Sequence, residues 1–383
     1  MSLYEIMILG AASRQQVEKL SCTIEKAIED FGLSIGSDVT MRDSEDWNQW
    51  DPKASTAAAY FADEAHLDED VASWLLDRSI PLIPVIKEGG TFEILPDKLK
   101  IPNGLMLSSA DPEMNALASA LLESVGLLRQ QRRVFVSYRR TESRGVAVQL
   151  HDILTGRGFD VFLDTHDIRP GEPFQDVLWH RMTDSDVVIV LDTKTYFERK
   201  WTREEFGKAM AKEIHIFRLV WPGHQPTEHL DTGEMVKLSS GDFTQRGELK
   251  EQVVDKIAVD IERIRSRSIA ARFRTLSGKL SAEIARMGAQ IEGISAHHAV
   301  AIRLSRGRRV WAYPVVGIPT ANLLNEIAER ASGFGDGTPV MVYDHAGIRD
   351  PWLKHLDWLD ANIGAVDTIK VFDAASRLVE LDT

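Results

Sequence analysis

Short apolar runs alternate with amphipathic runs from one end of the chain to the other. Residues 4–9 and 80–86 contain almost no polar side chain, which is typical of strands buried on both faces of a sheet. Residues 15–31 repeat apolar side chains every three or four positions, as an amphipathic helix does. Strands separated by helices predict a parallel sheet covered on both faces. The same pattern predicts strands at 38–41, 57–61 and 104–107 and helices at 68–77 and 114–128.

This alternation of predicted strands and helices begins again near residue 132 and a third time near residue 297. The middle part predicts strands at 133–138, 160–163, 187–191 and 214–220, with helices at 144–156, 174–183, 202–212 and 247–263. The last of these helices is expected to continue, as a surface helix or linker, through an arginine-rich stretch toward Met287. The final part predicts strands at 310–316, 339–343 and 368–372 and helices at 322–331 and 352–362. We therefore expect three α/β domains at 1–130, 131–265 and 297–383, with a helical linker at 266–296.

Length and composition indicate an ordinary globular protein. The length of 383 residues suits two or three domains, and 44% hydrophobic with 27% charged residues is ordinary for globular protein. No apolar run reaches about 18 residues, so no membrane span is expected. The apolar run near the N-terminus follows no basic residue, so we expect no signal peptide and a cytoplasmic protein.

Charge and cysteine content narrow the chemistry further. Cys22 is the one cysteine, which excludes an intramolecular disulfide and a cysteine-based zinc site. A net charge of -13 argues against a nucleic-acid partner, since proteins that bind nucleic acids usually present a basic face. A small anionic ligand bound by a few arginines stays compatible with this charge.

Candidate site residues follow the strands of the middle domain. Ligands of open parallel sheets bind outside the carboxyl ends of the strands, so these segments should meet at one edge. Tyr138, Arg139 and Arg140 follow the first strand, Asp164 and Gly171 the second, and Trp201 and Glu205 the third.

These residue types suit a dinucleotide whose glycosidic bond is broken. Arg139 and Arg140 can pair with a diphosphate, and Trp201 can stack on a flat base. The Glu205 carboxylate can hold ribose hydroxyls and stabilise an oxocarbenium-like transition state. The nicotinamide ring is a cationic pyridinium while it is bonded to the ribose and becomes neutral when it leaves. No strong general acid is therefore required, and a single carboxylate suffices for the cleavage.

Each of these residues also has an interpretation without function. Glu205, beside Glu204, can be an acid that favours a helix N-terminus. Trp201 can belong to the core, and Arg139 and Arg140 can be ordinary surface charges. Asp164 can cap a turn, and Gly171 after a proline is a turn signal.

Four stretches of the middle domain, in this order, resemble the TIR domain (Toll/interleukin-1 receptor type), especially its bacterial branch: VFVSYRR, FLDTHDIRPGE, DVVIVLD and WTREEF. In that family the Ser-Tyr strand with its basic residues is the first signature box, and the D…PG loop is the BB loop. A Trp with a Glu four residues later follows the third strand, as Trp201 and Glu205 do here. Thr202 replaces a common Cys and Arg199 a usual Ser, but the glutamate is kept.

The resemblance implies a flavodoxin-like parallel-sheet TIR domain, flanked by two further α/β domains, and the activity of an NAD+ nucleosidase. Such an enzyme cleaves the nicotinamide–ribose bond and gives nicotinamide and ADP-ribose or a cyclic isomer. Glu205 would be the catalytic glutamate, NAD+ the substrate, and no cofactor or metal is expected. By the same match, the substrate-binding residues would be Tyr138, Arg139, Arg140, Asp164, Gly171 and Trp201.

Enzymatic TIR domains usually complete their site between two protomers, so the resemblance also implies a homo-oligomer with TIR–TIR contacts. In bacteria it suggests an antiphage immune effector that assembly activates. Two alternatives stay open: a non-catalytic adaptor that acts through TIR–TIR contacts, and a nucleotide-binding sensor without turnover.

The flanking domains lack these residues. Aligning strand 80–83 with strand 214–217 places Val71 opposite Glu205, and no Ser-Tyr-Arg sequence follows the first strand. The first domain is therefore interpreted as a TIR-like copy without catalytic residues, or as an unrelated α/β domain. In the last domain the histidines lack a metal-site spacing, but His345 and Asp344 lie at a strand end and mark a candidate pocket. An activating ligand or protein would bind these flanking domains.

Overall fold

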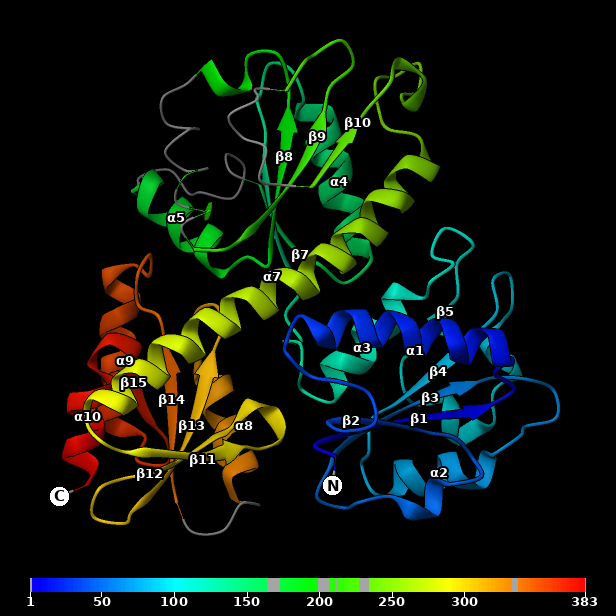
Figure 1. Cartoon of the computed structure of the whole chain (residues 1–383). Coiled ribbons are helices and arrows are strands. Elements are labelled where there is room, and N and C mark those ends of the chain that lie inside the picture. Colours follow the sequence, from blue (N-terminus) through cyan, green and yellow to red (C-terminus); the bar gives the residue numbers. More distant parts are fainter. Residues whose placement is uncertain are drawn as a thin grey trace. The chain divides into compact units, whose positions relative to one another are not determined.

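The computed structural model describes residues 2–163, 173–198, 207, 209–210, 212–226, 234–332 and 337–382. Within them the chain forms three five-stranded sheets, here named A, B and C (Figure 1). The chain divides into two compact units. The first comprises Met1–Gln130 and Asp255–Ser266, and the second comprises Gln131–Val254 and Arg267–Thr383.

Sheet A lies in the first unit, and all of its strand pairs are parallel. Its strand order is β2-β1-β3-β4-β5. Helices α1 and α3 lie on one face of the sheet and α2 on the other (Figure 1). The strands are β1 (Tyr4–Gly10), β2 (Val39–Arg42), β3 (Ser55–Phe61), β4 (Leu82–Ile86) and β5 (Leu105–Met106), and the helices are α1 (Arg14–Glu29), α2 (Glu69–Asp77) and α3 (Asn115–Ser124).

Sheet B repeats this topology in the second unit. All of its strand pairs are parallel, and the order β10-β9-β8-β6-β7 is that of sheet A read from the opposite edge. This is the flavodoxin-like order, so the expected fold is confirmed. Its strands are β6 (Arg133–Ser137), β7 (Asp160–Leu163), β8 (Val187–Asp192), β9 (His215–Val220) and β10 (Glu234–Lys237), with helices α4 (Arg144–Gly156) and α5 (Phe174–Asp184).

Sheet C is mixed. Strands β11 (Gln290–Ile294), β12 (Val300–Arg303) and β13 (Arg309–Val315) pair antiparallel, whereas β13, β14 (Thr338–Tyr343) and β15 (Asp367–Lys370) pair parallel. Helices α8 (Ala321–Ala331) and α9 (Asp350–Asn362) pack on one face. The end of α7 and helix α10 (Ala374–Leu381) pack on the other.

Helix α7 spans Glu251–Arg286 without a break, as the sequence pattern predicts (Figure 1). The interpretation of its arginines as a solvated face is wrong for two of them. Arg265 is fully buried, and its guanidinium pairs with the Glu123 carboxylate at 2.6 Å. Arg272 donates to the carbonyl oxygens of Thr183 and Ser185, at 2.7 and 2.8 Å, at the end of α5. Helix ends leave such carbonyls without intrahelical partners, so a guanidinium from a neighbouring helix satisfies them.

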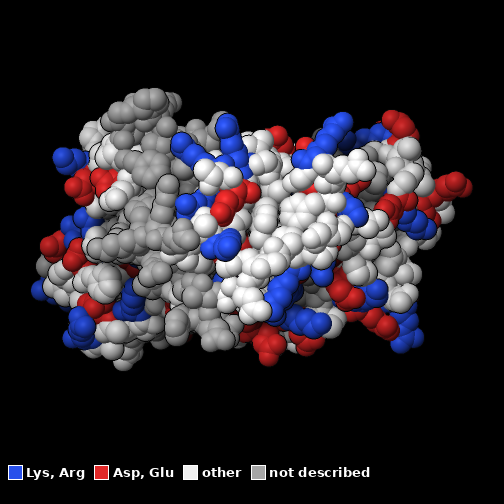
Figure 2. Space-filling model, turned by 90° about the horizontal axis from the view of Figure 1, so that it is seen from above, with Lys and Arg blue, Asp and Glu red and all other residues white. Residues whose placement is uncertain are grey.

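Charges of both signs cover the surface. On the face shown in Figure 2, Lys and Arg side chains are interspersed with Asp and Glu, and neither sign covers a continuous area. Among the residues that the structure describes, no helix is long and apolar enough to cross a membrane.

Candidate active site

The carboxyl edge of sheet B places three of the predicted substrate-binding residues together. Tyr138, Arg139 and Arg140 directly follow β6; Tyr138 is buried, Arg139 is partly buried and Arg140 is exposed. Just before them, the Ser137 hydroxyl is bonded at 2.6 Å to the buried hydroxyl of Tyr196, in the segment after β8. The ends of β6 and β8 are therefore fixed to each other.

Two further contacts join the same segments. The Arg139 guanidinium donates to the carbonyl oxygen of Thr195. The Glu142 carboxylate accepts the Thr195 hydroxyl at 2.7 Å and the Thr195 N–H at 3.4 Å. Burial would raise the pKa of Glu142, but hydrogen bonds from the threonine hydroxyls and the nearby Arg139 charge lower it. An ionised Glu142 thus anchors the loop that leads toward Trp201.

The other predicted site residues, Asp164, Gly171, Trp201 and Glu205, lie outside the described residues. Of the predicted site residues, the structure brings Arg139 to Thr195, which precedes Trp201 in the sequence by six residues. Helix α5 begins at Phe174, three residues after Gly171 in the sequence. The roles assigned to the four remaining residues stay predictions.

A buried charge cluster at the end of β8 was missed by the sequence interpretation. The Asp192 carboxylate pairs with the Arg218 guanidinium from β9, and both side chains are fully buried. The other Asp192 oxygen lies 3.2 Å from Nε2 of His224, in the loop after β9. The signal was present as an aspartate that ends an apolar strand and an arginine inside the next one. This cluster fixes β8, β9 and the following loop at the edge where the site is predicted.

No metal centre is visible in this region. Among the described residues, no group of three or more His, Cys, Asp or Glu side chains is arranged to bind a metal ion. The Asp192 carboxylate lies at the centre of its cluster, between the Arg218 guanidinium and the His224 ring, so the arrangement is that of an ion pair with a neighbouring histidine.

The same edge of sheet A is built differently. Gly10 ends β1 with φ at +76°, and its N–H donates to the Asp68 carboxylate at 2.8 Å. No Tyr-Arg-Arg sequence follows it. Val71, which the strand alignment places opposite Glu205, packs against the apolar core of its own unit. Sheets A and B therefore share a topology, while the polar residues at their carboxyl edges differ.

Comparisons with known proteins bear on sheet B. A family model described as TIR domain matches residues 134–255, which contain all of the predicted site residues. No curated protein matches the chain significantly.

Two solved structures are similar only at a very low level. Tagatose-6-phosphate ketose/aldose isomerase from Escherichia coli is 11% identical, with 72% of this chain and 83% of that chain covered and a TM-score of 0.20. A putative phosphosugar isomerase from Silicibacter pomeroyi is 10% identical, with 72% and 88% covered and a TM-score of 0.19. Scores this low do not indicate a shared fold. The family match, the parallel sheet in flavodoxin-like order and the Ser-Tyr-Arg-Arg segment at the end of β6 agree, so residues 134–255 of this chain belong to a TIR domain.

Proposed function

We propose that the TIR domain is an NAD+ nucleosidase with Glu205 as its catalytic carboxylate. The observation that carries the proposal is the Trp201–Glu205 pair, which follows the third strand of a segment that the TIR family model matches. Support comes from Arg139, whose guanidinium reaches from the end of β6 to Thr195, in the loop that leads to this pair.

The proposed reaction is NAD+ plus water to nicotinamide, ADP-ribose and a proton. The bond between ribose C1′ and the pyridinium nitrogen breaks, and its electron pair goes to the nitrogen, so nicotinamide leaves neutral. The Glu205 carboxylate stabilises the positive charge that develops on the ribose. Water then adds to C1′ and releases a proton; in cyclisation, a nucleophile of the same ADP-ribose takes the place of water.

The remaining residues would bind the substrate. Arg139 and Arg140 would pair with the diphosphate, because guanidinium groups match phosphate oxygens in charge and geometry. Trp201 would stack on a base. Tyr138, Asp164 and Gly171 would shape the entrance around them.

We further propose that assembly activates the enzyme, through TIR–TIR contacts between protomers, and that the protein acts in antiphage defence. The proposed domains are a TIR-like copy at 1–130, the catalytic domain at 131–265 and a sensor or assembly module at 297–383; the predicted helical linker at 266–296 holds the end of α7 and also strand β11 of sheet C. If the flanking domains bind the activating ligand or protein, this would explain why the TIR domain is joined to two further α/β domains.

The proposal is tested by incubating the full chain with NAD+ and separating the products by chromatography. Glu205→Gln keeps the shape of the side chain and removes its charge, and Glu204→Gln is the matched control one residue away. Loss of a transition-state charge partner typically lowers kcat by about 100- to 1,000-fold. Equal nicotinamide release by wild type and Glu205→Gln would remove Glu205 from the mechanism.

The two alternatives predict other results in the same experiment. If concentrated wild-type protein releases no nicotinamide, and changes in the loop at 164–174 abolish self-association, the adaptor function is favoured. If NAD+ binds saturably and is recovered intact, the protein is a sensor without turnover.

A further inference from the structure

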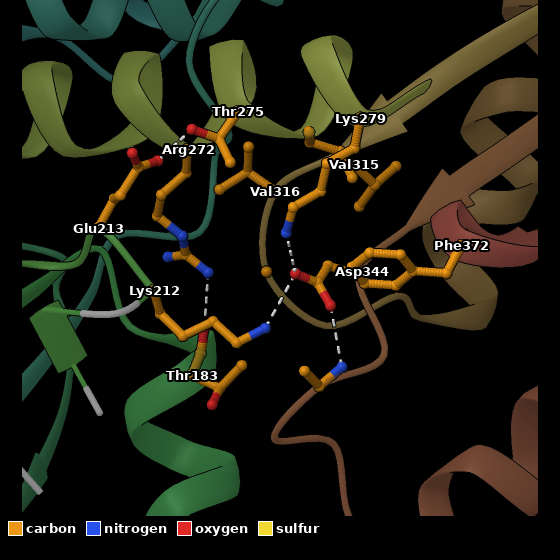
Figure 3. A pocket seen from close by; sticks show the side chains of 13 residues that line it. Thr183, Lys212, Glu213, Arg272, Thr275, Lys279, Val315, Val316, Asp344 and Phe372 are labelled. Atoms are coloured by element: carbon orange, nitrogen blue, oxygen red, sulfur yellow. Dashed lines mark hydrogen bonds and ion pairs between the residues drawn. The ribbon is translucent and has the colours of Figure 1, made fainter. Parts of the chain in front are cut away.

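A cavity of about 240 Å³ lies in the second unit, at the carboxyl ends of the parallel strands of sheet C (Figure 3). Its walls are the segments that follow β13, β14 and β15, one face of α7, and the residues Thr183, Lys212 and Glu213 of the TIR domain. Parallel sheets bind ligands at this edge, because the loops there are free to shape a pocket. The position agrees with the candidate pocket that the sequence predicts beside Asp344.

Three cationic side chains line this cavity: Lys212 from the TIR domain, and Arg272 and Lys279 from α7 (Figure 3). Lys212 and Lys279 contact the same carboxylate oxygen of Asp344, at 3.0 and 3.1 Å. Arg272 lies beside them on α7, and Glu213 bonds to the hydroxyl of Thr275. The lining thus carries three positive charges, on Lys212, Arg272 and Lys279, against two negative charges, on Glu213 and Asp344, which leaves one positive charge in excess. This local excess occurs in a chain whose net charge is -13.

The pKa shifts within the cluster agree with its excess of positive charge. Burial lowers the pKa of Lys212; Asp344 opposes this, and the positive charges of Lys279 and Arg272 lower the pKa further. Burial would raise the pKa of Asp344, but the Ala346 N–H and the two ammonium groups lower it to about 2. Asp344 is thus ionised and fully engaged, while Lys212 still repels its cationic neighbours. An added anion would relieve that repulsion.

An apolar wall adjoins the charged group. The Phe372 ring, which follows β15, lines the cavity and is 53% exposed. The Lys279 ammonium lies 5.1 Å from the centre of that ring, and Val315 and Val316 line the cavity beside it. An exposed aromatic face next to cations suits a ligand with a flat ring and a charged group.

We propose that this cavity binds a small phosphorylated ligand of mononucleotide size, with its phosphate among Lys212, Arg272 and Lys279 and its ring on Phe372. The site is separate from the predicted NAD+ site, since none of its residues belongs to the set assigned there.

The position of the cavity also suggests what the ligand would control. Lys212 follows Glu205 by seven residues in the sequence, and Thr183 lies in the last turn of α5, which begins after the predicted entrance loop. Beside the cavity, the Ile318 N–H donates to Asp184 at 2.9 Å and the Arg349 N–H donates to His180 at 3.3 Å, so the sheet C region contacts α5 directly. A ligand here would therefore change NAD+ cleavage; this effect, unlike the binding itself, rests on the proposed function.

Calorimetric titration of the full chain tests the binding claim, with AMP as probe and adenosine and inorganic phosphate for comparison. We expect saturable binding of AMP, and affinity for adenosine at least about tenfold lower, because a phosphate bond to a cation is lost. Lys279→Met should weaken AMP binding about 10- to 100-fold, and Phe372→Ala by at least about fivefold. Arg274→Ala is the matched control, because this arginine is exposed on the same helix and does not line the cavity.

Thermal unfolding without ligand shows whether each variant is folded, and Phe372→Ala tests the site independently of the ion pairs. The proposal is overturned if neither AMP nor inorganic phosphate binds saturably up to about 5 mM. It is also overturned if folded Lys279→Met and Phe372→Ala bind AMP like wild type while Arg140→Ala loses binding, since AMP would then occupy the NAD+ site. Binding that requires Lys279, without any nicotinamide release, would support this site and contradict the proposed enzyme.

Discussion

The buried pair of Asp192 and Arg218 offers a quantitative test of how the carboxyl edge of sheet B is held. Both side chains are fully buried, and the same carboxylate also contacts His224 at 3.2 Å. Asp192→Asn keeps the size of the side chain and removes its charge. The Arg218 guanidinium would then lose the Asp192 carboxylate, and removing one partner of a buried ion pair costs about 3–5 kcal/mol. A whole domain is stable by only about 5–15 kcal/mol, so the change should be large.

Hydrogen–deuterium exchange of peptides from β8 and β9 measures this loss locally in the full chain. A loss of about 3–5 kcal/mol corresponds to exchange roughly 100- to several thousand-fold faster. Asp192→Leu with Arg218→Met removes both charges, and it should be less destabilised than Asp192→Asn, because no buried charge is left alone.

The control is an exposed pair. Arg14 and Glu18 interact at 2.9 Å, but their side chains are 93% and 64% exposed, so Arg14→Gln should cost at most about 1 kcal/mol. If Asp192→Asn changes exchange in β8 and β9 by less than about fivefold, or if the double variant is the least stable, the reasoning about the buried pair is wrong.

Two further predictions concern single positions. Gly10→Ala should destabilise sheet A by about 2–5 kcal/mol, because φ is +76° and the new Cβ would lie 2.3 Å from the Phe61 carbonyl oxygen. Gly32→Ala, with the same φ and no atom within 4 Å, should cost only about 1–2 kcal/mol, and equal losses in urea unfolding would contradict the role of the contact. Burial lowers the pKa of His180 from 6.5 to about 4. On acidification between these two values the unfolded chain takes up the proton and the folded chain does not. The free energy of unfolding should therefore fall by about 1.4 kcal/mol per pH unit in this range. His180→Gln should remove the contribution of this residue to the dependence of stability on pH. His297 has a similarly lowered pKa and contributes too, so the quantity to compare is the slope of wild type against that of the variant. Identical slopes would contradict the prediction.

The sequence predicts all strands of sheet A and the interior strands of sheet B, but in sheet C it misses β12, a short buried strand between β11 and β13. Strand β7 and helix α4 begin and end at the expected residues, because a continuous apolar run and a complete helical stripe define them. Edge strands were missed: β10 is partly polar and β11 is exposed along its length. A strand at an edge packs against little, so its sequence lacks a strong apolar pattern.

Charged groups that meet through the fold could not be found from the sequence. Asp192 and Arg218 are 26 residues apart, and Lys212 and Asp344 come from opposite walls of one cavity. The sequence shows an aspartate at the end of one apolar strand and an arginine inside the next, but the fold alone decides which charges meet, and the burial of Arg265 was missed for that reason. The family motif could be recognised because its residues follow strand ends in a fixed order, which a linear sequence preserves.

The rate of nicotinamide release from NAD+ by wild type, Glu204→Gln and Glu205→Gln, at a protein concentration that permits self-association, tests the central claim most directly. The account predicts release by wild type and by Glu204→Gln, and a loss of about 100-fold or more in Glu205→Gln. Release by Glu205→Gln at the wild-type rate would contradict it.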